Sequence, residues 1–161
     1  MATTYAGPTF VTRVSVTRQN PPVRQATLES TGDVLTFGLP TWQSEFYDMP
    51  LDGEQAQHAG TWDHLVACVA SCLTGNLGTA LSARGIPSNG DLLTSEAEAD
   101  IEVDQGVLVM RRIRVHYRVR AVPEDKREAA ERAHDVHVRA CGIARAVQGS
   151  VEITTTMELV D

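Results

Sequence analysis

Residues 95–122, SEAEADIEVDQGVLVMRRIRVHYRVRAV, show the clearest two-residue alternation in the chain. In the first half, apolar residues alternate with carboxylates; in the second, they alternate with arginines and His116. Successive side chains on a strand point to opposite faces, so each half predicts a strand with one apolar and one charged face. Because the two charged faces have opposite signs, we expect the strands to pair as a hairpin.

The length of the turn decides whether the acidic and basic side chains share one face. We expect a three-residue loop, Asp104-Gln105-Gly106, with the glycine in the left-handed position of a bulged turn. A two-residue turn would place acids opposite valines. Cross-strand ion pairs then explain the arginine run, so a stripe that binds nucleic acid is not expected.

Helical patterns lie on both sides of this hairpin. Leucine and valine recur at helical spacing from Leu65 to Leu81, which predicts a long, mostly buried helix from Trp62 to Arg84, and a second helix follows Pro123 to about Cys141. A strand closes the chain, and strands with a hairpin around Gly32 precede the helices. This order predicts one α+β domain over residues 1–161, with helices covering a mostly antiparallel sheet.

Composition and charge argue against several classes of partner. The 161 residues are 42% hydrophobic, enough for one core, and the net charge of -7 argues against a nucleic acid or an anionic membrane as partner. The start, MATTYAGPTF, lacks the features of a signal peptide, and the longest apolar run, LVACVA, is too short to span a bilayer. We expect a cytoplasmic protein with no membrane partner.

The chain has three cysteines: Cys68, Cys72 and Cys141. An odd count in a reducing compartment argues against a static disulfide framework and leaves buried thiols, metal ligands or redox-active thiols. A thiol reacts as its thiolate, which a nearby cation favours. Arg145, one turn after Cys141, is a candidate for that cation. Its alternative role is to stabilise the carbonyl end of the helix.

A zinc site is the rival reading of the same residues. Each helix carries a stripe of ligand types, but three ligands rising along one helix span nearly two turns and do not converge on one ion. We therefore expect no metal site, and we expect His134 and His137 to face solvent. The two stripes are His64, Cys68 and Cys72, and His134, His137 and Cys141.

Two of these segments resemble the OsmC/Ohr family. HLVACVASCLTGNLGTALSARGI, residues 64–86, is similar to the central helix of that family, and RACGIARAV, residues 139–147, resembles its second cysteine motif. The resemblance implies an α+β fold in which mostly antiparallel sheets pack around two central helices of an intertwined homodimer. It implies no cofactor.

The resemblance also implies a chemistry, that of a thiol-dependent peroxidase. Cys72 would attack the distal oxygen of an organic hydroperoxide and become a sulfenic acid, and Cys141 would resolve it to a disulfide. A dithiol reductant, in some members a lipoylated protein, would reset the pair. Trp62, Leu65 and Cys68 would contact the substrate, although Cys68 is also read as core packing.

The chain departs from the family pattern beside these cysteines. Active members carry a glutamate about ten residues before the first cysteine, where this chain has Trp62, with Asp63 beside it. Gly142 stands where the family usually has proline. The arginine that steadies the thiolate comes from the N-terminal region, where the candidates are Arg13, Arg18 and Arg24. Two alternatives stay open: a non-enzymatic dimer that binds a small apolar ligand at the subunit interface, and a zinc-binding protein.

Overall fold

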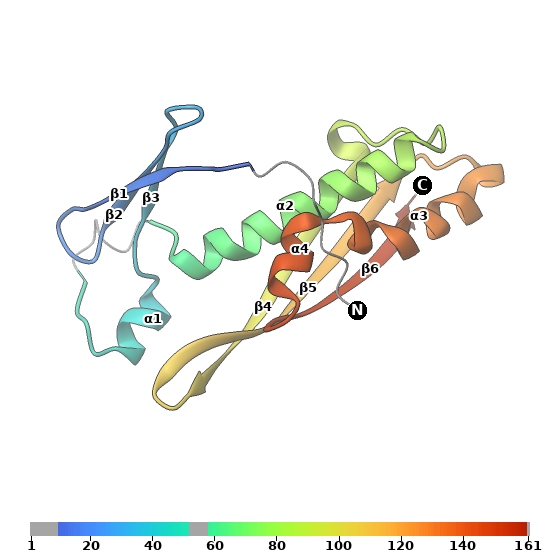
Figure 1. The fold of residues 1–161 in the computed structure, drawn as a ribbon. Helices are drawn as coiled ribbons and strands as arrows, with labels where there is room; N and C mark the ends of the chain where they lie inside the picture. Colours follow the sequence, from blue (N-terminus) through green and yellow to red (C-terminus); the bar gives the residue numbers. More distant parts are fainter. Residues whose placement is uncertain (1–9, 52–57, 161) are drawn as a thin grey trace, which may run out of the picture. The chain divides into compact units, whose positions relative to one another are not determined.

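The computed structural model describes residues 10–51 and 58–160. The chain divides into two compact units, residues 1–61 and 62–161, which are described separately. Figure 1 gives the order of the elements along the chain. That the whole chain is one domain stays a prediction.

The N-terminal unit contains a three-stranded antiparallel sheet followed by a short helix. Gly32, with φ of +80°, lies in the connection between the second and third strands, which confirms the predicted hairpin. The segment 39–60, expected to hold at most a short helix, has one; residues 52–57 lie outside the described part. The elements are β1 (Val14–Arg18), β2 (Arg24–Leu28), β3 (Val34–Phe37) and α1 (Thr41–Phe46).

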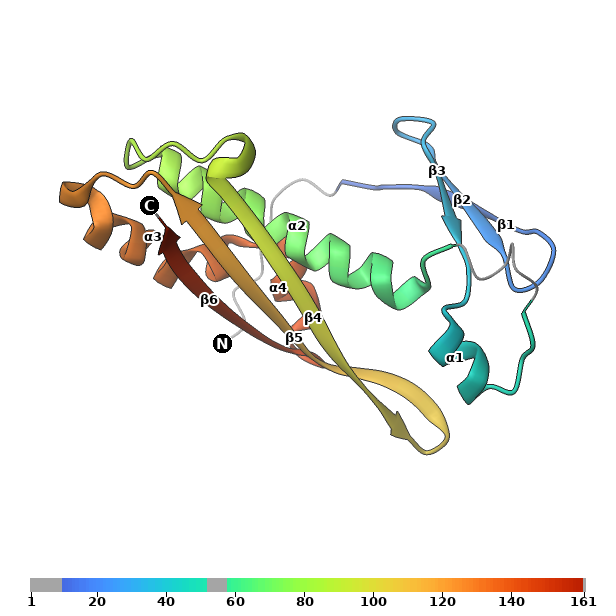
Figure 2. The same ribbon diagram turned by 180° about the vertical axis from the view of Figure 1, so that it is seen from behind.

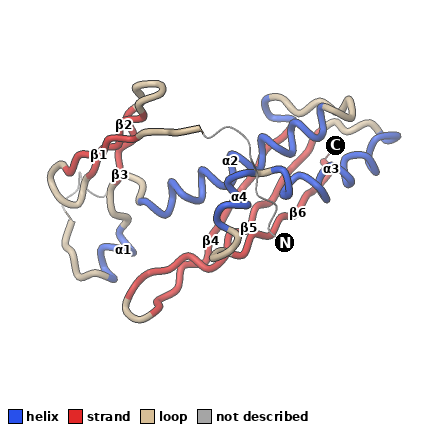
Figure 3. Tube along the Cα trace, viewed as in Figure 1, coloured by secondary structure: helices blue, strands red, loops and turns tan. Residues whose placement is uncertain are grey.

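The C-terminal unit is a second three-stranded sheet, ordered β4-β5-β6, with helices on one face. β4 and β5 are antiparallel, and β6 runs parallel to β5. Views from opposite sides place all three helices on the same face of the sheet (Figures 1 and 2), and Figure 3 separates the two layers by colour. The elements are α2 (Thr61–Ser82), β4 (Leu93–Asp104), β5 (Val107–Arg120), α3 (Arg127–Ala140), α4 (Gly142–Val147) and β6 (Glu152–Val160).

Helix α2 contributes one buried stripe to the core of this unit. The stripe packs with the apolar face of β5, as the sequence pattern predicts. The members of both sets are almost inaccessible: Val69, Leu73, Leu77 and Leu81 on α2, and Ile113, Val115, Tyr117 and Val119 on β5. The opposite face of α2 is exposed in this chain, so the prediction of a mostly buried helix is wrong. A sheet covers only one side of a helix.

Length and hydropathy alone would allow α2 to cross a bilayer. The longest uninterrupted apolar run, LVACVA, was too short to indicate a membrane span. Hydropathy averaged over 18 residues stays high in α2, because a few polar residues interrupt the run without lowering the average much. The core helix of a soluble protein passes the same test. In α2, 28% of the 18-residue window is buried in this chain, and the buried part includes Leu73, Leu77 and Leu81.

The turn of the β4–β5 hairpin differs from the sequence prediction. Asp104 pairs directly with Val107, so the turn has two residues, Gln105 and Gly106, both with positive φ. Acids near the turn do face valines: Glu102 lies opposite Val109. The predicted three-residue loop is therefore wrong, because the chain corrects the register elsewhere.

A β-bulge makes that correction. The register shifts between Asp100 and Ile101, which leaves Arg111 of β5 without a partner in the ladder. Beyond the bulge, Asp100 faces Arg112 and Glu98 faces Arg114, as the charge pattern predicts. One inserted residue moves every later side chain to the other face of the strand. The bulge therefore brings the acids opposite the arginines, as the predicted three-residue turn would have done.

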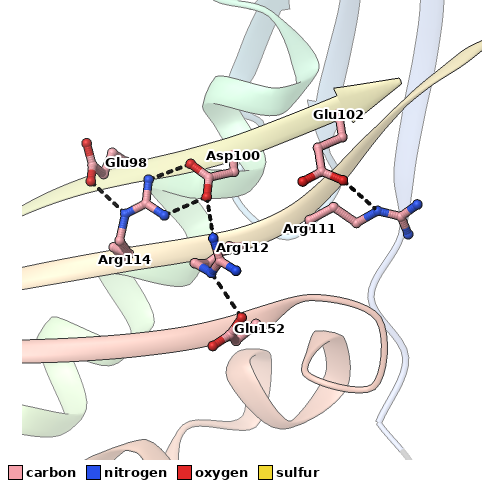
Figure 4. A network of polar contacts seen from close by, with 7 residues as sticks. All are labelled: Glu98, Asp100, Glu102, Arg111, Arg112, Arg114 and Glu152. Atoms are coloured by element: carbon pink, nitrogen blue, oxygen red, sulfur yellow. Dashed lines mark hydrogen bonds and ion pairs between the residues drawn. The ribbon is translucent and has the colours of Figure 1, made fainter. Parts of the chain in front are cut away.

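The charged face forms a connected set of ion pairs (Figure 4). Arg114 bonds both oxygens of Asp100, at 2.6 and 2.5 Å, and Arg112 bonds Asp100 at 2.7 Å and Glu152 at 2.9 Å. The bulged Arg111 reaches the acids near the turn. The interpretation of the arginine run as cross-strand ion pairs is confirmed.

Asp100 should make stability depend on pH. Hydrogen bonds from Arg114, then Arg112, lower the pKa of Asp100 from its ordinary 3.8 to about 2. Its contribution is therefore complete above about pH 4 and disappears as the pH falls through about 2. We expect Asp100→Asn to lower the melting temperature near neutral pH, and the difference from wild type to shrink steadily in acid.

Thermal denaturation from pH 2 to 7 at low salt checks this, because salt screens exposed charges. Glu96→Gln is the control, since Glu96 lies on the same face of β4 and has no ion pair among the described residues. A difference that stays constant across this range would contradict the assignment.

Candidate functional site

The fold brings Cys72 and Cys141 together. Cys72 lies in the middle of α2 and is half-buried, and Cys141, completely buried, lies between α3 and α4. The Cys141 thiol donates a hydrogen bond to Cys72, with 2.9 Å between the sulfurs. Both thiols are free, and the separation exceeds the roughly 2.05 Å of a disulfide bond. Residues 69 positions apart thus form one site.

Local geometry fixes the position of Cys141. Helix α3 ends at Ala140, and Cys141 takes an extended conformation, with φ -79° and ψ 109°. It is also the N-cap of α4, where its sulfur accepts a hydrogen bond from the backbone N–H of Ala144 at 3.4 Å. The helix predicted to run to about Cys141 thus ends one residue before it, and the break between α3 and α4 orients the thiol.

Burial is the main influence on the Cys141 thiol. It raises the pKa of Cys141, and the contact with Cys72 acts in the same direction, whereas the amides of Ala144 and Ile143 oppose both. The sequence suggested Arg145 as the cation beside this thiol. Arg145 is exposed on α4 and makes no hydrogen bond or ion pair with either cysteine in the described part of the chain. The role of Arg145 beside this thiol stays a prediction.

Asn76 is a site residue that the sequence reasoning did not assign. Its side-chain amide donates to the carbonyl oxygen of Cys72 at 2.8 Å and lies 3.6 Å from the Cys72 sulfur. A donor at this position can stabilise a negative sulfur without bringing a charge. The signal was present, because an asparagine four residues after a cysteine shares its helix face.

Tyr117 and His137 form a polar pair in the core, whose cluster of buried residues also includes Cys141. Their side chains are 0% and 1% exposed, and 2.9 Å separates the tyrosine oxygen from Nε2 of the histidine. The prediction that His137 faces solvent is therefore wrong. His134 is half-buried, its ring stacks on that of His137, and its Nε2 is buried with no hydrogen-bond partner in the described residues.

The other residues predicted on α2 have mixed outcomes. Trp62 and Leu65 are half-buried and pack against the core. Asp63 lies exposed in the first turn, where a carboxylate favours the positive helix end. Cys68 is exposed in this chain, so its interpretation as core packing is wrong. Whether any of them contacts a substrate stays a prediction.

The predicted arginines lie away from α2 in the sequence and belong to the N-terminal unit. Arg13 and Arg18 are exposed, and Arg24 donates to the carbonyl oxygen of Gly38 at 3.2 Å. Their role at the thiols stays a prediction. For zinc, residues 10–51 and 58–160 contain no group of three His, Cys, Asp or Glu side chains that could hold a metal ion.

Comparison with protein families gives one match. The model of a family described as "OsmC-like protein" matches residues 59–156. No curated protein matches the chain. The matched segment includes both cysteines of the site and the whole of the β4–β5 hairpin.

Solved structures with the same fold cover nearly the whole chain. An OsmC-like protein from Mycoplasma pneumoniae is 14% identical, with a TM-score of 0.71 over 94% of this chain and 99% of its own. The organic hydroperoxide resistance protein OsmC of Legionella pneumophila is 10% identical, with a TM-score of 0.68 over 94% and 99%. OhrB of Bacillus subtilis, also an organic hydroperoxide resistance protein, is 14% identical, with 0.61 over 92% and 98%. At these identities the likeness shows the fold.

Proposed function

We propose, from the premise that this chain belongs to the family of OsmC-like proteins, that it is a thiol-dependent peroxidase for organic hydroperoxides. One observation carries the proposal: the sulfurs of Cys72 and Cys141 lie 2.9 Å apart while both are free thiols. Two solved structures of the same fold are named for organic hydroperoxide resistance, which points to the same substrate class.

Cys72 is the attacking thiol in this proposal. Its thiolate attacks the distal oxygen of ROOH, the O–O bond breaks, and RO⁻ leaves and takes up a proton to form the alcohol. Cys72 is then a sulfenic acid. Asn76 stabilises the sulfur through its side-chain amide. Cys72 suits this role better than Cys141, because Cys72 is only half-buried and Cys141 is completely buried.

Cys141 resolves the sulfenic acid. Its sulfur forms the S–S bond, and the hydroxyl of the sulfenic acid leaves as water. A dithiol, which we propose to be a lipoyl group on a carrier protein, reduces the disulfide and restores both thiols. Such a cycle needs a reducing compartment, so we place the protein in the cytoplasm. We retain Trp62, Leu65 and Cys68 as the proposed substrate contacts, with Asp63 as a proposed support of the thiolate.

A turnover assay tests this function. Reduced protein is mixed with cumene hydroperoxide and dihydrolipoamide, and the consumption of each is followed. We expect catalytic consumption in equal amounts, faster than with hydrogen peroxide, because an apolar site favours an alkyl or aryl group. Absence of turnover together with tight binding of the corresponding alcohol, cumyl alcohol, would favour the non-enzymatic ligand-binding dimer.

We also propose that the protein is a homodimer that packs through the exposed face of α2. This face carries small residues at four-residue spacing, which allow close approach of a second helix: Ala67, Ser71, Gly75 and Thr79. A Cβ at Gly75 would meet nothing within 4 Å in this chain. Gly75→Arg should therefore leave the chain folded and block dimerisation.

Light scattering after size exclusion measures the outcome. We expect wild type at twice the 17.5 kDa of one chain and Gly75→Arg at the mass of one chain. The control is Gly149→Arg, because a Cβ at Gly149 also meets nothing within 4 Å and lies off α2. A Gly75→Arg variant that keeps the dimer mass would place the interface elsewhere.

A further inference from the structure

The N-terminal unit contains an open cavity of about 330 Å³ that takes no part in the proposed cycle. Residues of β1, β2, α1 and the segments that follow them line it, so one compact unit forms the whole cavity. A volume of this size suits a small organic molecule. The lining combines arginines with neutral polar and apolar residues, and this combination indicates which molecule would fit.

Two arginines of this lining, Arg18 and Arg24, face each other across the β1–β2 hairpin. They are direct partners in the antiparallel ladder, so their side chains leave the sheet on the same side, with Cβ atoms about 5 Å apart. Two like charges directly opposite one another destabilise a sheet. The pair is therefore a cost that another group should offset.

No carboxylate of residues 10–51 and 58–160 lies within ion-pair distance of Arg18 or Arg24. Acids are not scarce, since the chain has 21 of them against 14 lysines and arginines, and the arginines of the charged sheet face do find acid partners. Arg24 donates one hydrogen bond to the backbone oxygen of Gly38 at 3.2 Å, which orients its guanidinium. Its other N–H groups stay available to a ligand.

The neutral polar residues of the cavity add further donors. Gln43 of α1 has its Oε1 buried, whereas its Nε2 is not among the buried atoms and makes no hydrogen bond within the described part of the chain. The amide NH₂ is thus the group of Gln43 that can meet a ligand. Tyr47, which follows α1, contributes a hydroxyl and is 42% exposed. Among the described lining residues none is acidic, so the cavity offers positive charge and hydrogen-bond donors.

The rest of the lining is apolar. Pro22 and Leu39 are buried, and Met49 is 41% exposed. An inorganic anion would leave these surfaces in water, whereas a hydrocarbon group attached to the anion would cover them. Two guanidiniums beside an apolar wall therefore suit an anion with a hydrocarbon part.

We propose that this cavity binds a small organic carboxylate. The carboxylate lies between Arg18 and Arg24, whose planar guanidiniums match its two oxygens, and the hydrocarbon part covers Leu39 and Met49. Binding offsets the repulsion between the two arginines. The proposal does not depend on the peroxidase function, because the N-terminal unit contains no cysteine. Of the arginines predicted to support the thiolate, it leaves Arg13 for that role.

Isothermal titration calorimetry of the full-length protein at neutral pH and low salt tests the proposal. The probe is 3-phenylpropionate, which joins one carboxylate to an apolar body. We expect one site per chain with a Kd on the order of 0.1 mM, and a weaker affinity when added salt screens the charges. Three reference ligands should each bind at least tenfold more weakly: 3-phenylpropionamide has no charge, acetate has almost no apolar body, and inorganic phosphate has none.

Two substitutions test the arginines. Arg18→Gln removes a guanidinium from an exposed position, so the chain should stay folded while the affinity for the probe falls at least tenfold. Arg24→Gln should weaken binding as much, and circular dichroism shows whether the loss of its bond to Gly38 affects folding. The matched control is Arg139→Gln, which removes the same charge from an exposed position on α3 and should bind the probe as wild type does.

Three results would overturn the inference. The first is a wild type that does not bind the probe, and the second is equal affinity for the probe and any reference ligand. The third is unchanged affinity in Arg18→Gln, the variant that keeps the bond of Arg24 to Gly38. None of these results bears on the loss of thiols after hydroperoxide treatment, so failure here leaves the proposed function standing.

Discussion

Replacing Cys72 with serine is expected to abolish hydroperoxide consumption, to the rate of a solution without protein. The nucleophile in the proposed cycle is a thiolate, and a serine hydroxyl does not ionise near neutral pH. Thiol titration after one equivalent of cumene hydroperoxide gives the clearest measurement. Wild type should fall from three free thiols to one, and Cys72→Ser should keep both of its remaining thiols.

Two further variants show whether the effect belongs to Cys72. Cys68→Ser should still lose both of its remaining thiols after one equivalent of hydroperoxide, since Cys68 lies outside the sulfur pair. Cys141→Ser should react once and stop at the sulfenic acid. If Cys72→Ser still loses thiols as fast as wild type, another cysteine is the nucleophile.

The second large effect concerns the core that supports the site. Leu77, four residues beyond Leu73 on α2, is completely buried in the cluster that also contains Cys141. Leu77→Ala removes three carbons from this packing and leaves a cavity. We expect the free energy of unfolding to fall by about 2–5 kcal/mol, measured by urea denaturation.

Glu131→Ala, at an exposed position on α3, is the control and should change stability by less than about 0.5 kcal/mol. The same Leu77→Ala protein should form the Cys72–Cys141 disulfide more slowly, because a looser α2 no longer fixes the distance between the sulfurs. A loss below about 1 kcal/mol would mean that α2 does not hold this core together.

The sequence predicted the elements well where periodicity was strong. The alternation of residues 95–122 gave two paired strands with the correct inner face, and the leucine spacing gave α2 within two residues at each end. The turn was missed because a bulge and a longer loop satisfy the same charge pattern. The bulge and the longer loop differ only in the strand ladder. The bulge leaves Arg111 of β5 without a partner on β4.

Burial was harder to predict than secondary structure. The apolar pattern of α2 indicated a mostly buried helix, but a single sheet covers one stripe and leaves Cys68 exposed. His137 was expected in solvent because histidine is polar. It is buried because its position on α3 faces the sheet, where Tyr117 supplies a hydrogen bond.

The spacing of residues in the sequence could not predict the site formed by Cys72 and Cys141. Nothing in the local pattern states that Cys72 and Cys141 meet, since their approach depends on α2 and the α3–α4 junction packing on the same sheet face. Family resemblance pointed to the two residues. The contacts of Asn76 and of Ala144 with their sulfurs emerged only from the folded chain.

Peptide mapping after one equivalent of cumene hydroperoxide tests the account most directly. Reduced protein is treated, alkylated at its remaining thiols, digested without reductant and analysed by mass spectrometry. The account predicts one linked peptide pair joining Cys72 to Cys141, 2 Da lighter than the two thiol peptides together, with Cys68 alkylated. A bond that includes Cys68, or three alkylated cysteines, would contradict it.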